Sequence, residues 1–287
     1  MTKKHILIGT TAINRSILHK DVIPEWYNYI NVIDKSKYDV KWFINIDYIE
    51  KLDENVIDTK NNFENIIKDI DKIFINSEKN VKGNFLKACK NISLKIENYV
   101  EKNKLNKKDV IIIWLEDDWK LNNQNIPLQQ IIENYLSNLS YINLSYIRCN
   151  YIHALAPCIV NYELWSRVHL MAWKLQKDNI DPEHCVGLYF LKHFGKYENI
   201  LNVTIINKYK KIDNNFFNQN YLKSNQSYYT FDEENKNNII NNKYINKTDV
   251  KKLIKDKITF IRITCSSASD YGRDFLKKYN LKTTKNN

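Results

Sequence analysis

The segment IIIWLEDDWKL (residues 111–121) contains three consecutive acids, Glu116, Asp117 and Asp118. Adjacent carboxylates repel one another, so such a cluster is offset by a metal ion, a basic side chain or water. Two acids separated by one residue at the end of a strand project to the same side, as Glu116 and Asp118 would. Their oxygen atoms suit a hard divalent cation, Mn²⁺ or Mg²⁺. The alternative is a helix start whose dipole favours acidic residues.

The elements that position these acids follow an alternating pattern. Short apolar segments typical of buried strands alternate with segments of helical periodicity, which predicts an α/β fold with a mainly parallel sheet. The predicted strands are 5–11, 40–47, 109–117 and 257–265, and the predicted helices are 23–33, with Pro24 in its first turn, 83–103 and 127–139.

Polar residues end the first two predicted strands as well. Thr10 and Thr11 follow the first strand, and Asp47 ends the second. In open α/β sheets, ligands bind beyond the carboxyl ends of the strands, so these residues and the acidic cluster are expected to share one crevice. Asp47 can accept a hydrogen bond from a base or ribose, or it can cap a helix that begins at Tyr48.

The composition narrows the class of protein. A length of 287 residues, 43% hydrophobic content, five Gly and four Pro favour a folded, helix-containing domain. The net charge of +11 comes mainly from dispersed Lys, so nucleic-acid binding is not expected as the main function. Five scattered cysteines without a C-x-x-C pair predict a reducing compartment. No signal peptide or membrane span is expected, and we predict a cytoplasmic location.

Several segments together resemble glycosyltransferases with the GT-A fold, including those inferred for large DNA viruses and some bacteria. The resemblance lies in the apolar strand that delivers E-D-D-W, which resembles their D-x-D region, and in HILIGTTAINRSILHKDVIPEWYNYI, KWFINID, GNFLKACKNI and DYGRDFLKKYNL. It extends over most of residues 1–200 and the last thirty or so. It implies a GT-A-like mixed, mainly parallel sheet flanked by helices.

The resemblance also implies a single catalytic domain over residues 1–287. Residues 1–125 would bind the nucleotide-sugar, 126–212 would face the acceptor, and 251–287 would return to the donor site as a strand and a helix. The Asn-rich stretch 213–250 is either a surface insertion or a flap over the ligand.

The acidic cluster acquires specific roles from this resemblance. Asp118 would be the principal metal ligand, and Glu116 would contact the ribose or a metal-bound water. Glu116 stands where the family more often has Asp. Asp117 should point the other way along the strand and is also counted among the candidate nucleotide contacts.

The resemblance assigns further contacts to the nucleotide, each with a structural alternative. Thr10, Thr11, Asn14 and Arg15 would line its uracil or ribose side, or would only cap the loop. The helix start at Lys82 and Asn84 would face the nucleotide, or would be an ordinary N-cap.

The transfer chemistry implies a base and a cation. Glu183 is the predicted general base for an inverting transfer, with Asp181 in reserve, although Asp181 is also a good N-cap. Arg273 would offset charge at the leaving diphosphate. A retaining reaction would need no such base.

The resulting hypothesis is a metal-dependent glycosyltransferase. It would use a nucleotide-sugar, with UDP as the expected nucleotide, and a sugar or glycan hydroxyl as acceptor. The alternatives are a nucleotidyltransferase, against which the absence of a Gly-rich loop near the N-terminus argues, and a basic nucleic-acid-binding module.

Overall fold

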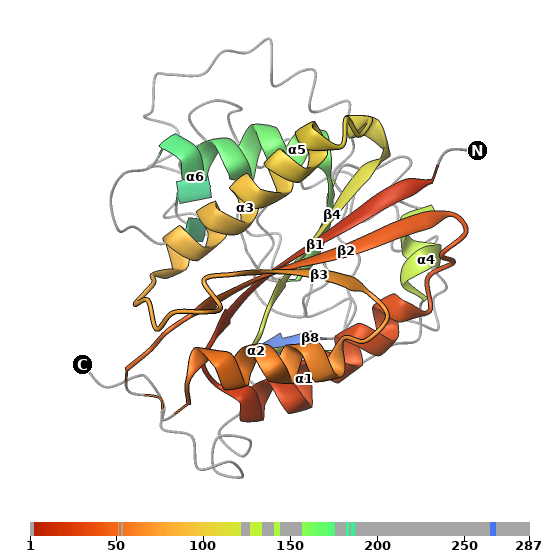
Figure 1. Ribbon diagram of the computed structural model, residues 1–287. Coiled ribbons are helices and arrows are strands. Elements are labelled where there is room, and N and C mark those ends of the chain that lie inside the picture. Colours follow the sequence, from red (N-terminus) through yellow and green to blue (C-terminus); the bar gives the residue numbers. More distant parts are fainter. Residues whose placement is uncertain are drawn as a thin grey trace, which may run out of the picture.

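A mixed, mainly parallel sheet forms the centre of the protein (Figure 1). The computed structural model describes residues 3–50, 52, 54–121, 127–133, 141–143, 157–175, 182–183, 185–186 and 265–267. Within these residues the sheet order is β3-β2-β1-β4-β7-β6. The first four strands are parallel, whereas β7 runs antiparallel to both β4 and β6. The strands are β1 Lys4–Ile13, β2 Tyr38–Asp47, β3 Asp71–Ile75, β4 Val110–Glu116, β6 Tyr141–Asn143 and β7 Cys158–Asn161. The α/β prediction is therefore confirmed.

The strand register brings the predicted polar strand ends to one edge of the sheet. Thr11 of β1 lies opposite Asn45 of β2 and Glu116 of β4, and Ile13 lies opposite Asp47. The chain moves outward from β1 through β2 to β3 and then returns to the other side of β1 as β4. Such a reversal of strand order is the point at which open α/β sheets bind ligands.

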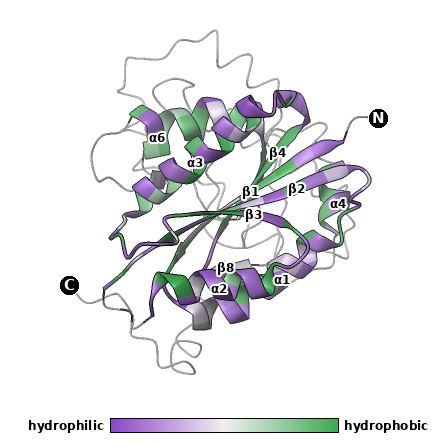
Figure 2. Ribbon diagram, viewed as in Figure 1, coloured by the Kyte–Doolittle hydropathy of each residue, from purple (hydrophilic) through white to green (hydrophobic). Residues whose placement is uncertain are grey.

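Helices cover both faces of the sheet (Figure 1). On one face lie α1 Ser16–Asn31 and α2 Val56–Ile66, which pack together. On the other face, α3 Phe85–Lys102 packs on β1 and β2. Its buried residues recur at helical spacing, and hydrophobic and hydrophilic residues alternate along its ribbon (Figure 2). The shorter helical elements are η1 Lys107–Asp109, α4 Leu128–Ile131, α5 Tyr162–Trp165, the π-helix η3 Ser166–Leu170 and α6 Met171–Leu175.

Large aromatic side chains fill the core between the sheet and the helices. The indoles of Trp42, Trp114 and Trp173 are almost completely buried, and those of Trp114 and Trp173 lie 5.2 Å apart. Gly9 of β1 lies beneath Trp114, because a Cβ atom at this position would be 2.9 Å from the ring. The tight packing on β1 and β4 makes the centre of the sheet a rigid support for the strand ends.

A second, two-stranded antiparallel sheet pairs β5 Trp119–Leu121 with β8 Cys265–Ser267. The chain directly after the acidic cluster therefore pairs with a segment almost 150 residues further on. Of the predicted strand 257–265, only the last residue lies in the described part of the chain, and 213–250 lies outside it.

The first helix differs from its prediction. It begins at Ser16, not near residue 23, so Pro24 lies inside the helix. A proline at this position removes the hydrogen bond to the carbonyl of Lys20, and Lys20 is exposed to solvent. Sequence patterns also missed β3 and α2. Among the described helices, none combines the length and the apolar character that a membrane crossing requires.

Candidate functional site

A cleft of about 280 Å³ opens at the ends of β1, β2 and β4, beside the start of α3. Most of the residues that the sequence singled out meet there. The predicted residues that line it are Thr11, Arg15, Asp47, Asn84, Glu116, Asp117 and Asp118. Gly83 and Phe85 contribute to the wall from the start of α3. The expectation that the strand ends share one crevice therefore holds for Thr11, Asp47 and the acidic cluster, but not for Thr10.

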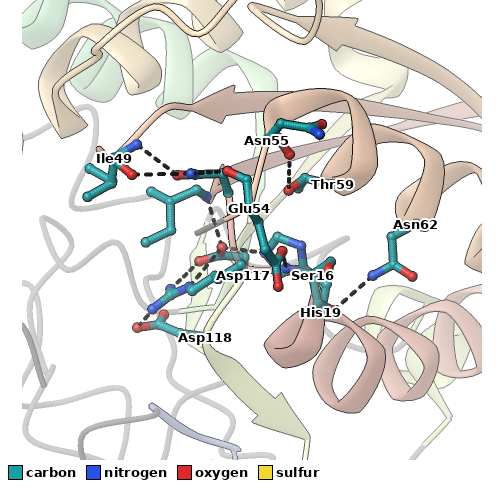
Figure 3. A network of polar contacts seen from close by, with 12 residues as sticks. Ser16, His19, Ile49, Glu54, Asn55, Thr59, Asn62, Asp117 and Asp118 are labelled. Carbon is teal, nitrogen blue, oxygen red and sulfur yellow. Dashed lines mark hydrogen bonds and ion pairs between the residues drawn. The ribbon is translucent and has the colours of Figure 1, made fainter. Parts of the chain in front are cut away.

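Asp117 is the centre of a buried network that holds the turn after β1 (Figure 3). Its Oδ1 accepts a hydrogen bond from Arg15 Nη2 at 2.6 Å. Its Oδ2 accepts from the backbone N–H of Ile13 at 3.0 Å, from Arg15 Nε at 3.3 Å and from His19 Nε2 at 2.6 Å. Burial alone would raise the pKa of Asp117, but the charge of Arg15 and the bond from His19 outweigh it and hold the pKa far below its usual value.

This network explains the position of Asp117. Both of its oxygen atoms already accept bonds from the protein, which argues against the predicted contact with a nucleotide. Its side chain reaches back to the β1–α1 turn, and its backbone N–H bonds to Thr11 O at 3.1 Å. Asp117 thus joins the end of β4 to the turn that carries Arg15.

Glu116 and Asp118 carry the unbalanced negative charge of the cleft. Glu116 Oε2 accepts a bond from Trp119 Nε1 at 2.7 Å. Burial, followed by the charges of Asp118 and Glu183, raises the pKa of Glu116 well above its usual value. Burial also raises the pKa of Asp118, against the opposing effect of Arg15, whose Nη2 lies 3.5 Å from Asp118 Oδ2. A divalent cation would relieve this charge.

Glu183 lies close enough to Glu116 for its charge to raise the pKa of that residue. The preceding residue, Pro182, is held in the core, because Trp173 Nε1 donates to Pro182 O at 3.1 Å. The predicted base therefore lies near Glu116, one of the two predicted metal ligands. Its reserve, Asp181, and the predicted cation Arg273 lie outside the described residues.

Asp47 lies against Gly83, just before the start of α3, and lines the cleft. It is 4% exposed, and Asn45 Nδ2 donates to its Oδ1 at 2.8 Å. Burial raises its pKa. A Cβ atom on Gly83 would lie 2.1 Å from Asp47 Oδ1, so any side chain at position 83 would displace the Asp47 carboxyl group. The alternative role of Asp47 as a helix cap is wrong, because Tyr48 forms an isolated β-bridge with Lys82 and the next helix begins at Val56.

Three predicted nucleotide contacts do not line the cleft, and the structure gives each another environment. Thr10 is fully buried and its Oγ1 accepts a bond from Trp42 Nε1 at 2.7 Å. Asn14 is fully buried and ties the turn to the carbonyls of Ile49 and Glu54. The side chain of Lys82 points to solvent. These positions correct the prediction for Thr10 and Asn14, whose polar atoms bond within the protein.

Asn84 combines both of its predicted roles in one place. It is the N-cap of α3, accepting a bond from Lys87 N at 2.7 Å, and it lines the cleft. The first turn of α3 contains no acidic residue. Its positive dipole end is therefore available to an anion or to polar groups of a ligand in the cleft.

Two residues of the site were missed by sequence reasoning. His19 is fully buried, bonds to Asp117 and packs its ring 4.7 Å from that of Phe63. The sequence did contain one indication of this role, because His19 follows Arg15 by four residues, the spacing that brings two side chains together on one side of a helix. The other residue is Glu54, whose carboxylate accepts a hydrogen bond from Ser16 N at the start of α1. No local pattern indicates this contact, because it joins residues 38 positions apart.

Comparison with known proteins adds little to this geometry. No family model matches the chain, and no curated protein matches it. Among solved structures, core-mannan synthase A from Aspergillus fumigatus in its Mn/GDP form is similar at 10% identity and a TM-score of 0.31. The match covers 66% of this chain and 70% of that one. A likeness at this level leaves the function to be argued from the cleft itself.

Proposed function

We propose that the chain is a metal-dependent glycosyltransferase, which moves a sugar from a nucleotide-sugar, with UDP as the expected nucleotide, to a hydroxyl of a sugar or glycan acceptor. One observation carries this proposal: Glu116 and Asp118 leave the end of β4 as an incompletely neutralised pair of acids. They do so in a cleft at the reversal point of the strand order.

The charge balance of the cleft favours a metal. Among the described residues that line it are four carboxyl groups, of Asp47, Glu116, Asp117 and Asp118, but a single guanidinium, that of Arg15. Asp117 takes two hydrogen bonds from this guanidinium. A diphosphate would meet net repulsion here without a further positive charge. A divalent cation bound with the nucleotide removes that repulsion.

The donor atoms present fit a hard cation. Asp118 is 28% exposed on the cleft side, and carboxylate oxygens are the ligands that Mg²⁺ and Mn²⁺ prefer. The described residues contain no group of three or more His, Cys, Asp or Glu arranged to hold a metal. Asp118 and Glu116 would therefore share the ion with water and diphosphate oxygens. When bound, the metal supplies electrostatic stabilisation of the departing diphosphate.

The remainder of the cleft suits a nucleoside. Asp47 offers an acceptor for a base N–H or a ribose hydroxyl, and Thr11 adds a hydroxyl at the end of β1. The absence of a side chain on Gly83 keeps Asp47 and the start of α3 in direct contact. Asp47 ends β2 and the acidic pair follows β4, with β1 and Thr11 between them, so base and diphosphate would have separate places.

Glu183 would complete the reaction as the general base of an inverting transfer. Its carboxylate would take the proton of the acceptor hydroxyl while the oxygen of that hydroxyl bonds to the anomeric carbon. The bond from this carbon to the diphosphate oxygen breaks at the same time, and the electron pair leaves with the nucleoside diphosphate. The position of Glu183 near Glu116 supports this role.

The β1–α1 turn argues against a dinucleotide-binding or nucleotidyl-transfer site. Such sites commonly place a phosphate on the helix that follows the first strand, after a Gly-rich turn. Here the turn contains no glycine, and the carboxylate of Glu54 occupies the start of α1. An anion is therefore directed to the acidic pair and its cation, not to α1.

The proposal is tested by thermal unfolding with UDP, GDP, CMP or ADP, each with and without Mn²⁺. A nucleotide at 100 times its Kd should stabilise the folded protein by about 2.7 kcal/mol. We expect one nucleotide to stabilise the wild type only with Mn²⁺, and Asp118→Asn to abolish this effect while the fold remains intact.

The matched control is Asp39→Asn, which removes an exposed acid at the opposite end of the sheet and should keep the response. If no nucleotide stabilises the wild type with Mn²⁺, the proposal is refuted. Unfolding of Asp118→Asn would identify Asp118 as a structural acid.

A further inference from the structure

We propose that Arg15 binds the diphosphate oxygens of the nucleotide, and that His19 is a positioning residue that fixes Arg15 through Asp117. This inference rests on the proposed function. It moves Arg15 from the base and ribose side of the ligand, where the sequence placed it, to the reacting end. It also gives a role to His19, which no sequence pattern singled out.

The place of Arg15 in the cleft indicates which part of the ligand it would meet. Its side chain is 21% exposed and lines the cleft, and its Nη2 atom is 3.5 Å from Asp118 Oδ2. Asp118 is the residue proposed to hold the metal with the diphosphate. A guanidinium at this distance from Asp118 would lie beside the same phosphoryl groups, whereas Asp47 ends β2, on the other side of β1 from β4.

Arg15 keeps hydrogen-bond donors for a ligand. A guanidinium has five N–H groups, and Asp117 takes one from Nε and one from Nη2. None of the described residues accepts a bond from Nη1. Charge-assisted bonds from arginine to phosphate are short and strong. The unused donors on the exposed edge of Arg15 therefore suit phosphoryl oxygens.

The structure also leaves few other donors on this side of the cleft. Glu54 occupies the N-terminus of α1, so the first N–H group of this helix is already bonded. The backbone N–H of Ile13 bonds to Asp117. A phosphoryl group near Asp118 thus finds Arg15 as the available cation among the described residues.

His19 determines where Asp117, and therefore Arg15, can lie. His19 is fully buried on α1, one helical turn after Arg15, and its Nε2 is 2.6 Å from Asp117 Oδ2. Since an ionised carboxylate only accepts, Nε2 carries the proton of this bond. The ring is held by Phe63 of α2. His19 thus connects the packed helical layer to the carboxylate that orients the guanidinium (Figure 3).

The test compares the binding of UDP and of uridine by calorimetry with Mn²⁺ present, replaced by the matching pair if another base stabilises the wild type. His19→Phe keeps an aromatic ring against Phe63 but removes the N–H donor. We expect it to weaken UDP binding at least tenfold while uridine binding changes less than twofold. His19→Gln, which restores an N–H donor, should recover most of the UDP affinity.

Coupling between the residues gives a second readout. Arg15→Ala should weaken UDP binding by a similar factor, and the double variant Arg15→Ala/His19→Phe should be no weaker than Arg15→Ala alone. Non-additivity of this kind shows that two residues act through one interaction. His5→Gln is the matched control, because His5 lies at the start of β1 in an exposed pair with Asp39.

The possible outcomes distinguish failure of the proposed function from failure of this inference. Absence of nucleoside diphosphate binding to the wild type refutes the proposed function and this inference together. Wild-type binding that His19→Phe and Arg15→Ala both retain refutes the inference alone. An equal loss of UDP and uridine binding also refutes it, because the damage would then be general. If His19→Phe does not fold, Arg15→Lys provides the test, with the same selective loss expected.

Discussion

Asp117→Asn is the substitution for which the structure predicts the loss of folding stability most directly. Asparagine has the shape of aspartate but carries no charge, and one of its two polar atoms donates instead of accepting. The Oδ2 side of Asp117 faces three donors, so the asparagine oxygen should take that place. Its NH₂ group then confronts Arg15 Nη2 where a 2.6 Å bond existed.

The magnitude follows from the burial of the pair. Removal of one partner from a buried ion pair costs about 3–5 kcal/mol. Arg15 is 21% exposed and has Asp118 at 3.5 Å as a substitute partner, so the lower end applies. We expect Asp117→Asn to lower the free energy of unfolding by about 3 kcal/mol at pH 7.

The lowered pKa of Asp117 also predicts how the stability difference between wild type and Asp117→Asn changes with pH. The pKa of Asp117 is lowered in the folded protein, so its contribution is fully present above the unfolded value of about 3.9. The contribution declines as the pH falls below that value and is gone once the pH has fallen through the folded value. The stability gap between wild type and variant should be constant from pH 5 to 8 and should narrow below about pH 4.

The assay is urea denaturation at 25 °C across this pH range, with the midpoint and slope fitted for both proteins. Asp39→Asn, at an exposed site, should change stability by less than about 0.5 kcal/mol. A gap below about 1 kcal/mol, the scale of an exposed ion pair, would refute the reasoning. So would a gap that widens as the pH falls toward 4.

Three further predictions concern the cleft. Gly83→Ala places a Cβ atom 2.1 Å from Asp47 Oδ1 and should weaken nucleotide binding in calorimetry about tenfold, a change of roughly 1.4 kcal/mol. Its control is Gly9→Ala, whose Cβ atom meets Trp114 at 2.9 Å. This control should lower folding stability but leave the nucleotide affinity of the folded protein unchanged. Asp47→Asn should stabilise the ligand-free protein in urea at pH 8 but not at pH 4, because a raised carboxyl pKa means that wild-type stability falls as the pH rises through it. Mn²⁺ binding, followed by electron paramagnetic resonance, should weaken as the pH falls from 8 to 5, because protons compete at the raised pKa values of Glu116 and Asp118.

For each of these three predictions, the same measurement could give a result that contradicts it. Unchanged nucleotide affinity in Gly83→Ala would mean that Asp47 can move without consequence. A destabilised Asp47→Asn at pH 8 would show that its ionised form is favoured in the fold. Mn²⁺ affinity that does not depend on pH would place the ion away from the acidic pair.

The sequence predicted the strands and the helix that surround the cleft because they are strongly patterned. Strands buried on both faces, such as β1 and β4, read as continuous apolar runs. Helix α3 shows an apolar stripe at helical spacing. In contrast, the edge strand β3 is only half-buried, and α2 has few apolar residues, so neither gives a clear pattern.

The roles of individual residues were harder to predict, because they depend on partners far along the chain. Thr10 and Thr11 are neighbours on β1, and alternation along the strand sends one into the core and the other to the cleft. Their order does not reveal which is which. Asp117 meets its partners Arg15 and His19 across 102 and 98 residues. Only the parallel pairing of β1 with β4 brings these residues together.

The side chain of Asn14 has a consequence for how the protein opens locally. Its amide accepts a bond from Ile49 N and donates to Ile49 O and Glu54 O, while the Glu54 side chain bonds to the start of α1. These bonds join the β1–α1 turn to the loop between β2 and α2, so neither segment can move away without breaking bonds to the other. Amide hydrogen exchange should therefore show the β1–α1 turn and the β2–α2 loop opening as one cooperative unit. The rate at which this side of the cleft opens to a ligand would then depend on both segments together.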